Sequence, residues 1–158
     1  MKSTGNSNIS QIKISKLWVA DMSQHQQDVA AFLQDWVETK EQNKNGFERL
    51  YKQLQNKEKG SIEFHPRPGV TYSLRGMTGG KEAPALYVMV DVIEDEPRWL
   101  SVCFYGAMIT DPLEKGAFVP GGLLGEDAIC FDLEQYSQQE FAYVEARIEE
   151  AYASAVKG

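Results

Sequence analysis

The sequence predicts an α+β domain of two layers: a mainly antiparallel sheet of about five strands, with two N-terminal helices and one C-terminal helix packed on one face. Two observations predict this fold class. The apolar spacing is helical towards both ends of the chain and changes to the two-residue period of strands between them. Short links join consecutive strands, which favours antiparallel pairing with the helices gathered on one side of the sheet.

Length and charge limit the domain count and the classes of partner. The 158 residues suit a single domain, which we expect over residues 16–158, after a disordered or loosely packed tail over residues 1–15. The net charge of −7 argues against nucleic acid and anionic membranes as partners, because both attract basic proteins. Without an apolar run long enough for a membrane span or a signal peptide, a cytoplasmic protein is expected.

Capping signals mark the helices. The stretch Ser23–Gln26 fits a capping box at the start of the first helix, which we expect to run until the polar stretch Glu41–Gly46. Its apolar face comprises Val29, Phe32, Leu33, Trp36 and Val37. A second helix carries Phe47, Leu50, Tyr51 and Leu54 on one face and stops near Gly60.

The last helix has the clearest start in the chain. Ser137–Glu140 forms a second capping box, and Tyr136 and Phe141 are spaced as a hydrophobic staple. The buried stripe that follows comprises Phe141, Val144, Ile148, Ala151, Tyr152 and Ala155.

Alternating residues predict the first two strands. Ile62 and Phe64 alternate with polar neighbours, and Val70, Tyr72 and Leu74 do the same after a break at Pro66 and Pro68. Because proline cannot donate to a ladder, these two residues mark a connection or a sheet edge.

Two apolar segments, residues 85–93 and 98–105, predict the centre of the sheet. An even-numbered turn between them would place Val92 opposite Trp99 and Val88 opposite Cys103, and an odd-numbered turn would change that pairing. A long connection follows over residues 106–127, and a last strand is expected over residues 128–133.

Both faces of the central strands are apolar, although three helices cover one face. Monomers rarely expose an apolar patch of that size, so we expect a cover. The 106–127 connection is the first candidate, because it carries Phe118, Val119, Leu123 and Leu124. Self-association through the sheet face is the second, and a bound ligand is the third.

The stretch from Ile62 to Gly76 holds the best candidate site. His65, Arg67 and Arg75 could converge on a carboxylate or phosphate, because arginine binds such anions through a fixed planar fork. Tyr72, Trp99 and Tyr105 are expected to line the walls. The simpler interpretation is a hairpin whose polar residues face water and whose Arg75 pairs with a nearby acid.

Other motifs give weaker signals. The glycine-rich stretch 119–127 runs into a strand rather than a helix, unlike a phosphate-binding loop. No spacing typical of a zinc site occurs, so no metal or other cofactor is expected. Cys103 and Cys130 lie in apolar runs and are interpreted as inert core thiols rather than a disulfide, with their distance from each other left open.

The sequence therefore predicts a non-enzymatic binding or interaction module. The alternative is a small-molecule or anion-binding protein, including an enzyme, with a site between the 65–75 hairpin and the 106–127 connection. In that alternative, His65 transfers a proton while Arg67 and Arg75 hold an anion.

Overall fold

The computed structural model describes residues 23–80 and 82–157. The chain divides into two compact units, residues 1–35 and 36–158, and each is described by itself. The expected tail over residues 1–15 lies outside the described residues. The expectation of one domain from residue 16 onward stays a prediction.

The first unit contains α2 (Gln24–Asp35), which begins at the predicted capping box. The Gln26 amide donates to the Ser23 hydroxyl at 3.2 Å, and the Ser23 amide donates to the Gln26 side-chain oxygen at 2.9 Å. The prediction that this helix includes Trp36 and Val37 was wrong, and Val37 is 81% exposed. The apolar spacing continues past the last helical turn and therefore gives no signal for where the helix ends.

The helix α3 (Asn43–Gln55) begins within the stretch that was expected to end the first helix. The Glu38 carboxylate accepts hydrogen bonds from the Lys44 and Asn45 amides at 3.1 and 2.8 Å, which satisfies donors that a helix start leaves unpaired. The predicted face of this helix is confirmed by its buried residues Phe47, Leu50 and Leu54.

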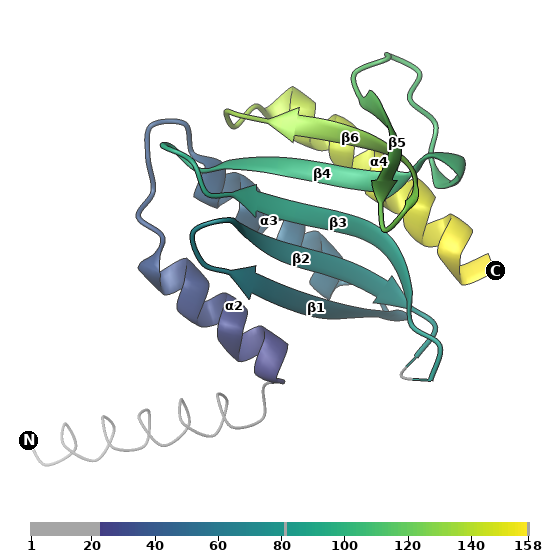
Figure 1. The fold of residues 1–158 in the computed structure, drawn as a ribbon, viewed down its shortest axis with the longest axis horizontal. Helices are drawn as coiled ribbons and strands as arrows, with labels where there is room; N and C mark the ends of the chain where they lie inside the picture. The colour runs from purple at the N-terminus through teal and green to yellow at the C-terminus, as the bar shows by residue number, and fades with distance from the viewer. Residues whose placement is uncertain (1–22, 81, 158) are drawn as a thin grey trace, which may run out of the picture. The chain divides into compact units, whose positions relative to one another are not determined.

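A six-stranded antiparallel sheet forms the centre of the second unit, in the order β1-β2-β3-β4-β6-β5 (Figure 1). Its strands are β1 (Gly60–Arg67), β2 (Thr71–Thr78), β3 (Ala85–Ile93), β4 (Trp99–Tyr105), β5 (Ala117–Leu123) and β6 (Glu126–Leu133). The short 3-10 helix η1 (Gly106–Met108) follows β4.

The additional strand, β5, lies inside the segment that was predicted to be one long connection. Its sequence contains Pro120, Gly121 and Gly122, residue types that are uncommon in strands, so the alternating pattern is hidden. The fold class is confirmed: an α+β chain with an antiparallel sheet, two N-terminal helices and one C-terminal helix.

The helices α3 and α4 (Gln138–Lys157) pack on the same face of the sheet (Figure 1). The predicted staple at the start of α4 is confirmed, with the ring centroids of Tyr136 and Phe141 5.0 Å apart. The Glu140 amide donates to the Ser137 hydroxyl at 3.4 Å, while the Glu140 carboxylate pairs with Lys115 at 2.6 Å.

The register of β3 and β4 differs from the even-turn prediction by one residue. Ile93 lies opposite Trp99, and Met89 lies opposite Cys103. The connecting segment, residues 94–98, has an odd number of residues and contains a cis bond between Glu96 and Pro97. An odd-numbered turn shifts the pairing, as the strand geometry requires.

Strand alternation separates the two faces of the sheet. One transverse row is buried on the face that α4 covers, where the Phe131 ring lies 6.0 Å from the Tyr143 ring of α4. The paired residues of this row are Phe64, Leu74, Val90, Val102 and Phe131. Each is at most 3% exposed, so this row is the centre of the core.

Candidate functional site

The face of the sheet opposite α3 and α4, called the second face here, carries a row of polar side chains. Each member of this row is the immediate sequence neighbour of a residue in the buried core row, and the members pair with one another across five strands. We call it the polar row: His65, Ser73, Asp91, Ser101 and Asp132. Because neighbouring residues on a strand point to opposite faces, the register alone brings these five residues into line.

Asp91 occupies the centre of the polar row. Burial raises the pKa of its carboxyl group, and the hydrogen bond with Ser73 and the charges of Arg75 and Arg67 act in the opposite direction. One Asp91 carboxylate oxygen is buried and accepts no hydrogen bond from the described residues. In the polar row, the hydrogen bond and the two positive charges therefore only partly offset the cost of burying the ionised Asp91 carboxylate.

Arg67 and Arg75 differ from the other three arginines of the chain. Arg49, Arg98 and Arg147 each pair with a glutamate, whereas no ion pair within 4 Å among the described residues includes Arg67 or Arg75. Arg75 donates a long hydrogen bond of 3.4 Å to the Ser73 hydroxyl. Both guanidinium groups influence Asp91 from a distance, which leaves their donors available to a further acceptor.

Five of the six predicted site residues belong to the second face by strand parity: His65, Arg67, Arg75, Trp99 and Tyr105. Two of them are engaged locally. His65 pairs with Glu63 at 2.8 Å, and the Trp99 indole donates to Asp95 at 3.0 Å. Burial raises the pKa of the Tyr105 hydroxyl, and the charge of Arg75 acts to lower it. The two side chains are therefore close enough to interact electrostatically.

Tyr72, the sixth predicted site residue, lies on the other face of the sheet from these five. Tyr72 is two residues from Leu74 on β2 and therefore lies on the same face of the sheet as Leu74. Its ring stacks with that of Phe64, a member of the buried core row, with the ring centroids 6.5 Å apart. The Arg98 guanidinium lies 5.2 Å from the Tyr72 ring centroid on that side. A strand residue cannot share a face with its immediate neighbours Thr71 and Ser73.

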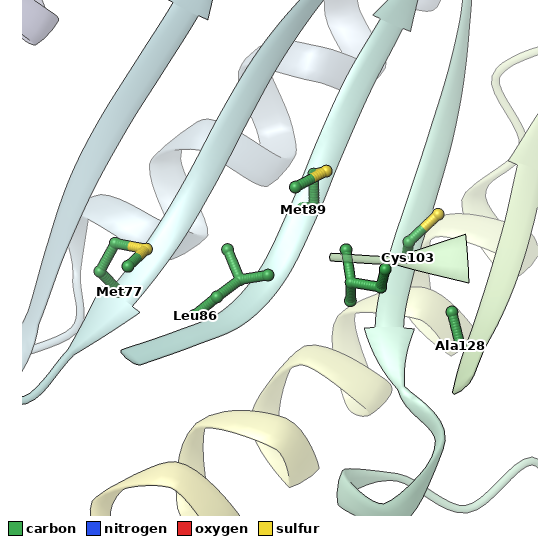
Figure 2. Packing of buried hydrophobic residues seen from close by; sticks show 6 residues of the cluster. Met77, Leu86, Met89, Cys103 and Ala128 are labelled. Atoms are coloured by element: carbon green, nitrogen blue, oxygen red, sulfur yellow. The ribbon is translucent and has the colours of Figure 1, made fainter. Parts of the chain in front are cut away.

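Beyond the polar row, the second face becomes apolar. We call this part the apolar cluster: Met77, Leu86, Met89, Cys103, Leu123 and Ala128 (Figure 2). Figure 2 shows the labelled members side by side on neighbouring strands. Leu123, at the end of β5, is 2% exposed and packs with this cluster.

The expected cover is therefore present in part. Leu123 covers the apolar cluster, and the other apolar residues of the same segment remain outside it. Phe118 and Leu124 are each 64% exposed, and Val119 is 37% exposed. The apolar surface that needs explaining lies on the β5–β6 hairpin rather than on the middle of the sheet.

The two cysteines form a disulfide, so their interpretation as core thiols rather than a disulfide was wrong. Cys103 and Cys130 lie directly opposite each other on β4 and β6, with Cα atoms 4.2 Å apart. The sequence shows that both residues lie in strands. It does not show which strands are neighbours or in what register, and those two facts bring the sulfurs together.

The distance between the Cα atoms of Cys103 and Cys130 also indicates which way the backbone N–H and C=O groups of β5 point. A spacing near 4.5 Å is typical of an antiparallel pair without mutual hydrogen bonds. The backbone groups of Cys130 therefore point away from β4 and towards its other partner, Ala117. Alternation then directs the N–H and C=O of Phe118 away from β6, towards the outside of the sheet.

Gly116 agrees with this assignment. Its N–H, two residues before that of Phe118, donates to the Asp111 carboxylate at 2.8 Å instead of to β6. Among the described residues, no turn or loop hydrogen bond involves the Phe118 backbone. We call the outward side of residues 116–120 the β5 edge.

A cavity of about 410 Å³ lies beside the β5 edge. Its walls include Tyr105, Ala107, Phe118 and Ile129, and its acidic residues are Glu126 and Asp127. None of the ion pairs among the described residues includes either acid. Asp127 accepts a hydrogen bond from the Gly121 amide at 3.1 Å, which closes the hairpin.

Two sites thus went unnoticed in the sequence. Asp91 could have been found as a carboxylate inside a continuous apolar strand. The β5 edge had no comparable signal, because proline and glycine concealed the strand, and the importance of Phe118 depends on its backbone direction.

The comparisons with known proteins add no relatives. No family model, curated protein or solved structure matches the chain. Within the described residues, no helix has the length and apolar character needed to cross a membrane. In the same part of the chain, no cluster of three or more histidine, cysteine or acidic side chains could hold a metal ion.

Proposed function

We propose that this protein is a non-enzymatic binding module that adds an extended segment of a partner to the β5 edge. The single observation that carries the proposal is the outward backbone of Phe118, with its ring exposed beside an apolar cavity. Strand addition derives affinity from main-chain hydrogen bonds and specificity from pockets for alternate side chains. The β5 edge offers both.

The contrast between the two edges of the sheet supports this choice. The other edge strand, β1, carries Pro66 and the charged or titratable residues Glu63, His65 and Arg67. Proline and charge are common protections of edge strands against pairing. The strand β5 also contains a proline, Pro120, but it carries no charged residue, so its first residues Ala117, Phe118 and Val119 remain suited to pairing.

Selection from a displayed peptide library on the immobilised full chain tests the proposal. Selected peptides should bind the wild type and Val70→Lys, and should lose binding to Phe118→Lys. Val70 is a matched control because it is an exposed apolar residue, 50% accessible, in the β1–β2 turn. A lysine at position 118 places charge on the edge and removes the ring, as natural edge protection does.

Peptides that bind Phe118→Lys as well as they bind the wild type would contradict this proposal. Loss of binding to Arg67→Ala or Arg75→Ala instead would move the site to the polar row.

The second candidate function is anion binding by Arg67 and Arg75 beside the polar row, because neither arginine takes part in an ion pair within 4 Å in the described part of the chain. A ligand carboxylate or phosphate would receive charge-assisted hydrogen bonds from both guanidinium groups. Asp91 opposes this binding, because its negative charge lies in the same neighbourhood.

Thermal unfolding in phosphate or citrate distinguishes this candidate. If the polar row binds anions, either salt should raise the melting temperature of the wild type more than that of Arg75→Ala. Sodium chloride at equal ionic strength controls for screening. Equal shifts in both proteins would eliminate the candidate.

A further inference from the structure

We propose that the segment bound at the β5 edge is a basic, apolar peptide: an extended strand with a lysine or arginine two residues before a large apolar residue. This inference rests on the proposed function and specifies the partner. Register, charge and cavity shape each contribute one part of it.

The pairing of a bound strand with β5 would fix the positions of two side chains of the partner. Because the N–H and C=O of Phe118 both point outward, the residue opposite Phe118 in an antiparallel partner would exchange two hydrogen bonds with it. The side chain of that residue lies on the same face as the Phe118 ring, next to the cavity. The partner residue two positions earlier lies opposite Pro120, on the same face.

Charge identifies the earlier residue as basic. The ladder is regular up to Val119 opposite Ala128 and irregular beyond it, and the Asp127 carboxylate accepts a hydrogen bond from the amide of Gly121, the residue after Pro120, at 3.1 Å, which places this acid beside Pro120. Asp127 and Glu126 make no ion pair with a cation among the described residues. The charge of Glu126 also raises the pKa of the Tyr105 hydroxyl, after the larger effect of burial, which places this carboxylate at the cavity.

The cavity identifies the central residue as apolar. Aromatic and aliphatic side chains of Tyr105, Phe118 and Ile129 line an open cavity of about 410 Å³. Pockets that are apolar with a few polar groups at their rim select ligands by shape and orient them by charge. An isoleucine, leucine or phenylalanine side chain suits this volume.

A second copy of this chain fits the edge less well. The segment Ala117–Leu123 contains no lysine or arginine, so a copy paired through β5 would supply no cation to Asp127. The nearest basic residue, Lys115, already pairs with Glu140. Two chains of net charge −7 also repel each other, whereas a basic peptide is attracted.

Fluorescence anisotropy with four labelled octapeptides tests the proposal on the full chain. The lead peptide is Gly-Thr-Lys-Val-Leu-Val-Thr-Gly, and a second peptide replaces its lysine with glutamate. A third carries N-methyl-leucine, which removes the one amide that would donate to the Phe118 carbonyl. A fourth exchanges the lysine and the following valine, so that charge is kept and register is lost.

The lead peptide should bind, and the other three should bind at least about tenfold more weakly, because each lacks one matched contact. The variant Glu126→Gln/Asp127→Asn should reduce the difference between the lysine and glutamate peptides to less than about threefold. Glu58→Gln, an exposed acid outside the cavity lining, should keep the full difference.

The possible failures are distinguishable. If the glutamate peptide binds as tightly as the lead and both lose binding to Phe118→Lys, the charge inference is wrong while the proposed function stands. If binding depends on charge but not on N-methylation or on Phe118, the attraction is unspecific and both fail. Concentration-dependent dimers in light scattering that Phe118→Lys abolishes, with no peptide binding, would make a second copy the occupant.

Discussion

Gly46 illustrates how a single residue allows two helices of the second unit to pack. A Cβ atom at this position of α3 would lie 2.3 Å from Cζ of Phe141 in α4. Phe141 is fully buried, and its ring also contacts Tyr136, so it has little room to move. The helical interior would ordinarily favour alanine over glycine, but contact with the ring reverses that preference.

We therefore predict that Gly46→Ala lowers the free energy of unfolding by roughly 1–3 kcal/mol, the usual cost of overpacking a core. Chemical denaturation measures the effect, and Glu48→Ala, at an exposed position of the same helix, serves as the control. A stabilised Gly46→Ala variant would show that Phe141 can be displaced without cost.

Asp91 provides a second prediction at this scale. Its folded-state pKa is raised above the ordinary value of 3.8, chiefly by burial. Between the unfolded and folded pKa values the native state holds more protons, so the stability that Asp91 contributes is greatest below pH 3.8 and falls as the pH rises through the folded pKa. At neutral pH the ionised carboxylate is a net cost to the fold.

Asp91→Asn should accordingly unfold at a higher denaturant concentration than the wild type at pH 7, and this advantage should vanish below pH 3.8. Asp132→Asn replaces an exposed acid of the same polar row and is the control. A wild type that is more stable than Asp91→Asn at pH 7 would mean that Arg67 and Arg75 compensate the charge fully.

At the scale of elements, β5 shows how a strand can escape recognition and still define a surface. Its pairing with β6 follows from geometry: Ala117 lies opposite Cys130 and Phe118 opposite Ile129. Successive residues of β5 direct their backbone groups alternately towards β6 and away from it. Which residues point outward is set by the register of the ladder and not by any local residue preference.

Amide hydrogen exchange in the free protein tests which amides of β5 point towards β6 and which point outward. The Phe118 amide should exchange rapidly because it points out of the sheet, whereas the Ala117 and Val119 amides should be protected by β6. Residue-resolved NMR would measure the three rates. Rapid exchange of Val119 with protection of Phe118 would reverse the assignment and remove the basis of the proposed function.

The β3–β4 hairpin shows what local patterns leave undecided. Its two strands were recognisable from their apolar residues, whereas its register depends on whether the turn has an even or odd number of residues. A shift of one residue decides whether Met89 or Val88 shares a row with Cys103. Pattern locates strands, and turn geometry sets their alignment.

At the scale of the whole molecule, the disulfide links strands that are separated by 27 residues in the sequence. Closing a loop of this length restricts the unfolded chain and stabilises the fold by roughly 2–4 kcal/mol. We predict a loss of that size in Cys103→Ser/Cys130→Ser, measured by denaturation without reductant.

Wild-type protein in excess dithiothreitol should lose the same stability, and unreduced protein unfolded in denaturant should contain no reactive thiol. Two reactive thiols in that assay would restore the interpretation of separate cysteines. The result also bears on the expected cytoplasmic location, because disulfides are rare in reducing compartments.

The sequence by itself determined the helices, most of the strands and the α+β class, because each depends on spacing and caps within about a dozen residues. Strand alternation alone also puts Arg75 on one face with Ser73 and Thr71. Only the tertiary structure decided that Asp91 joins them, that Cys103 meets Cys130 and that Phe118 turns its backbone outward. These three facts depend on which strands are neighbours and in what register, and residues far apart in the chain specify that jointly through packing.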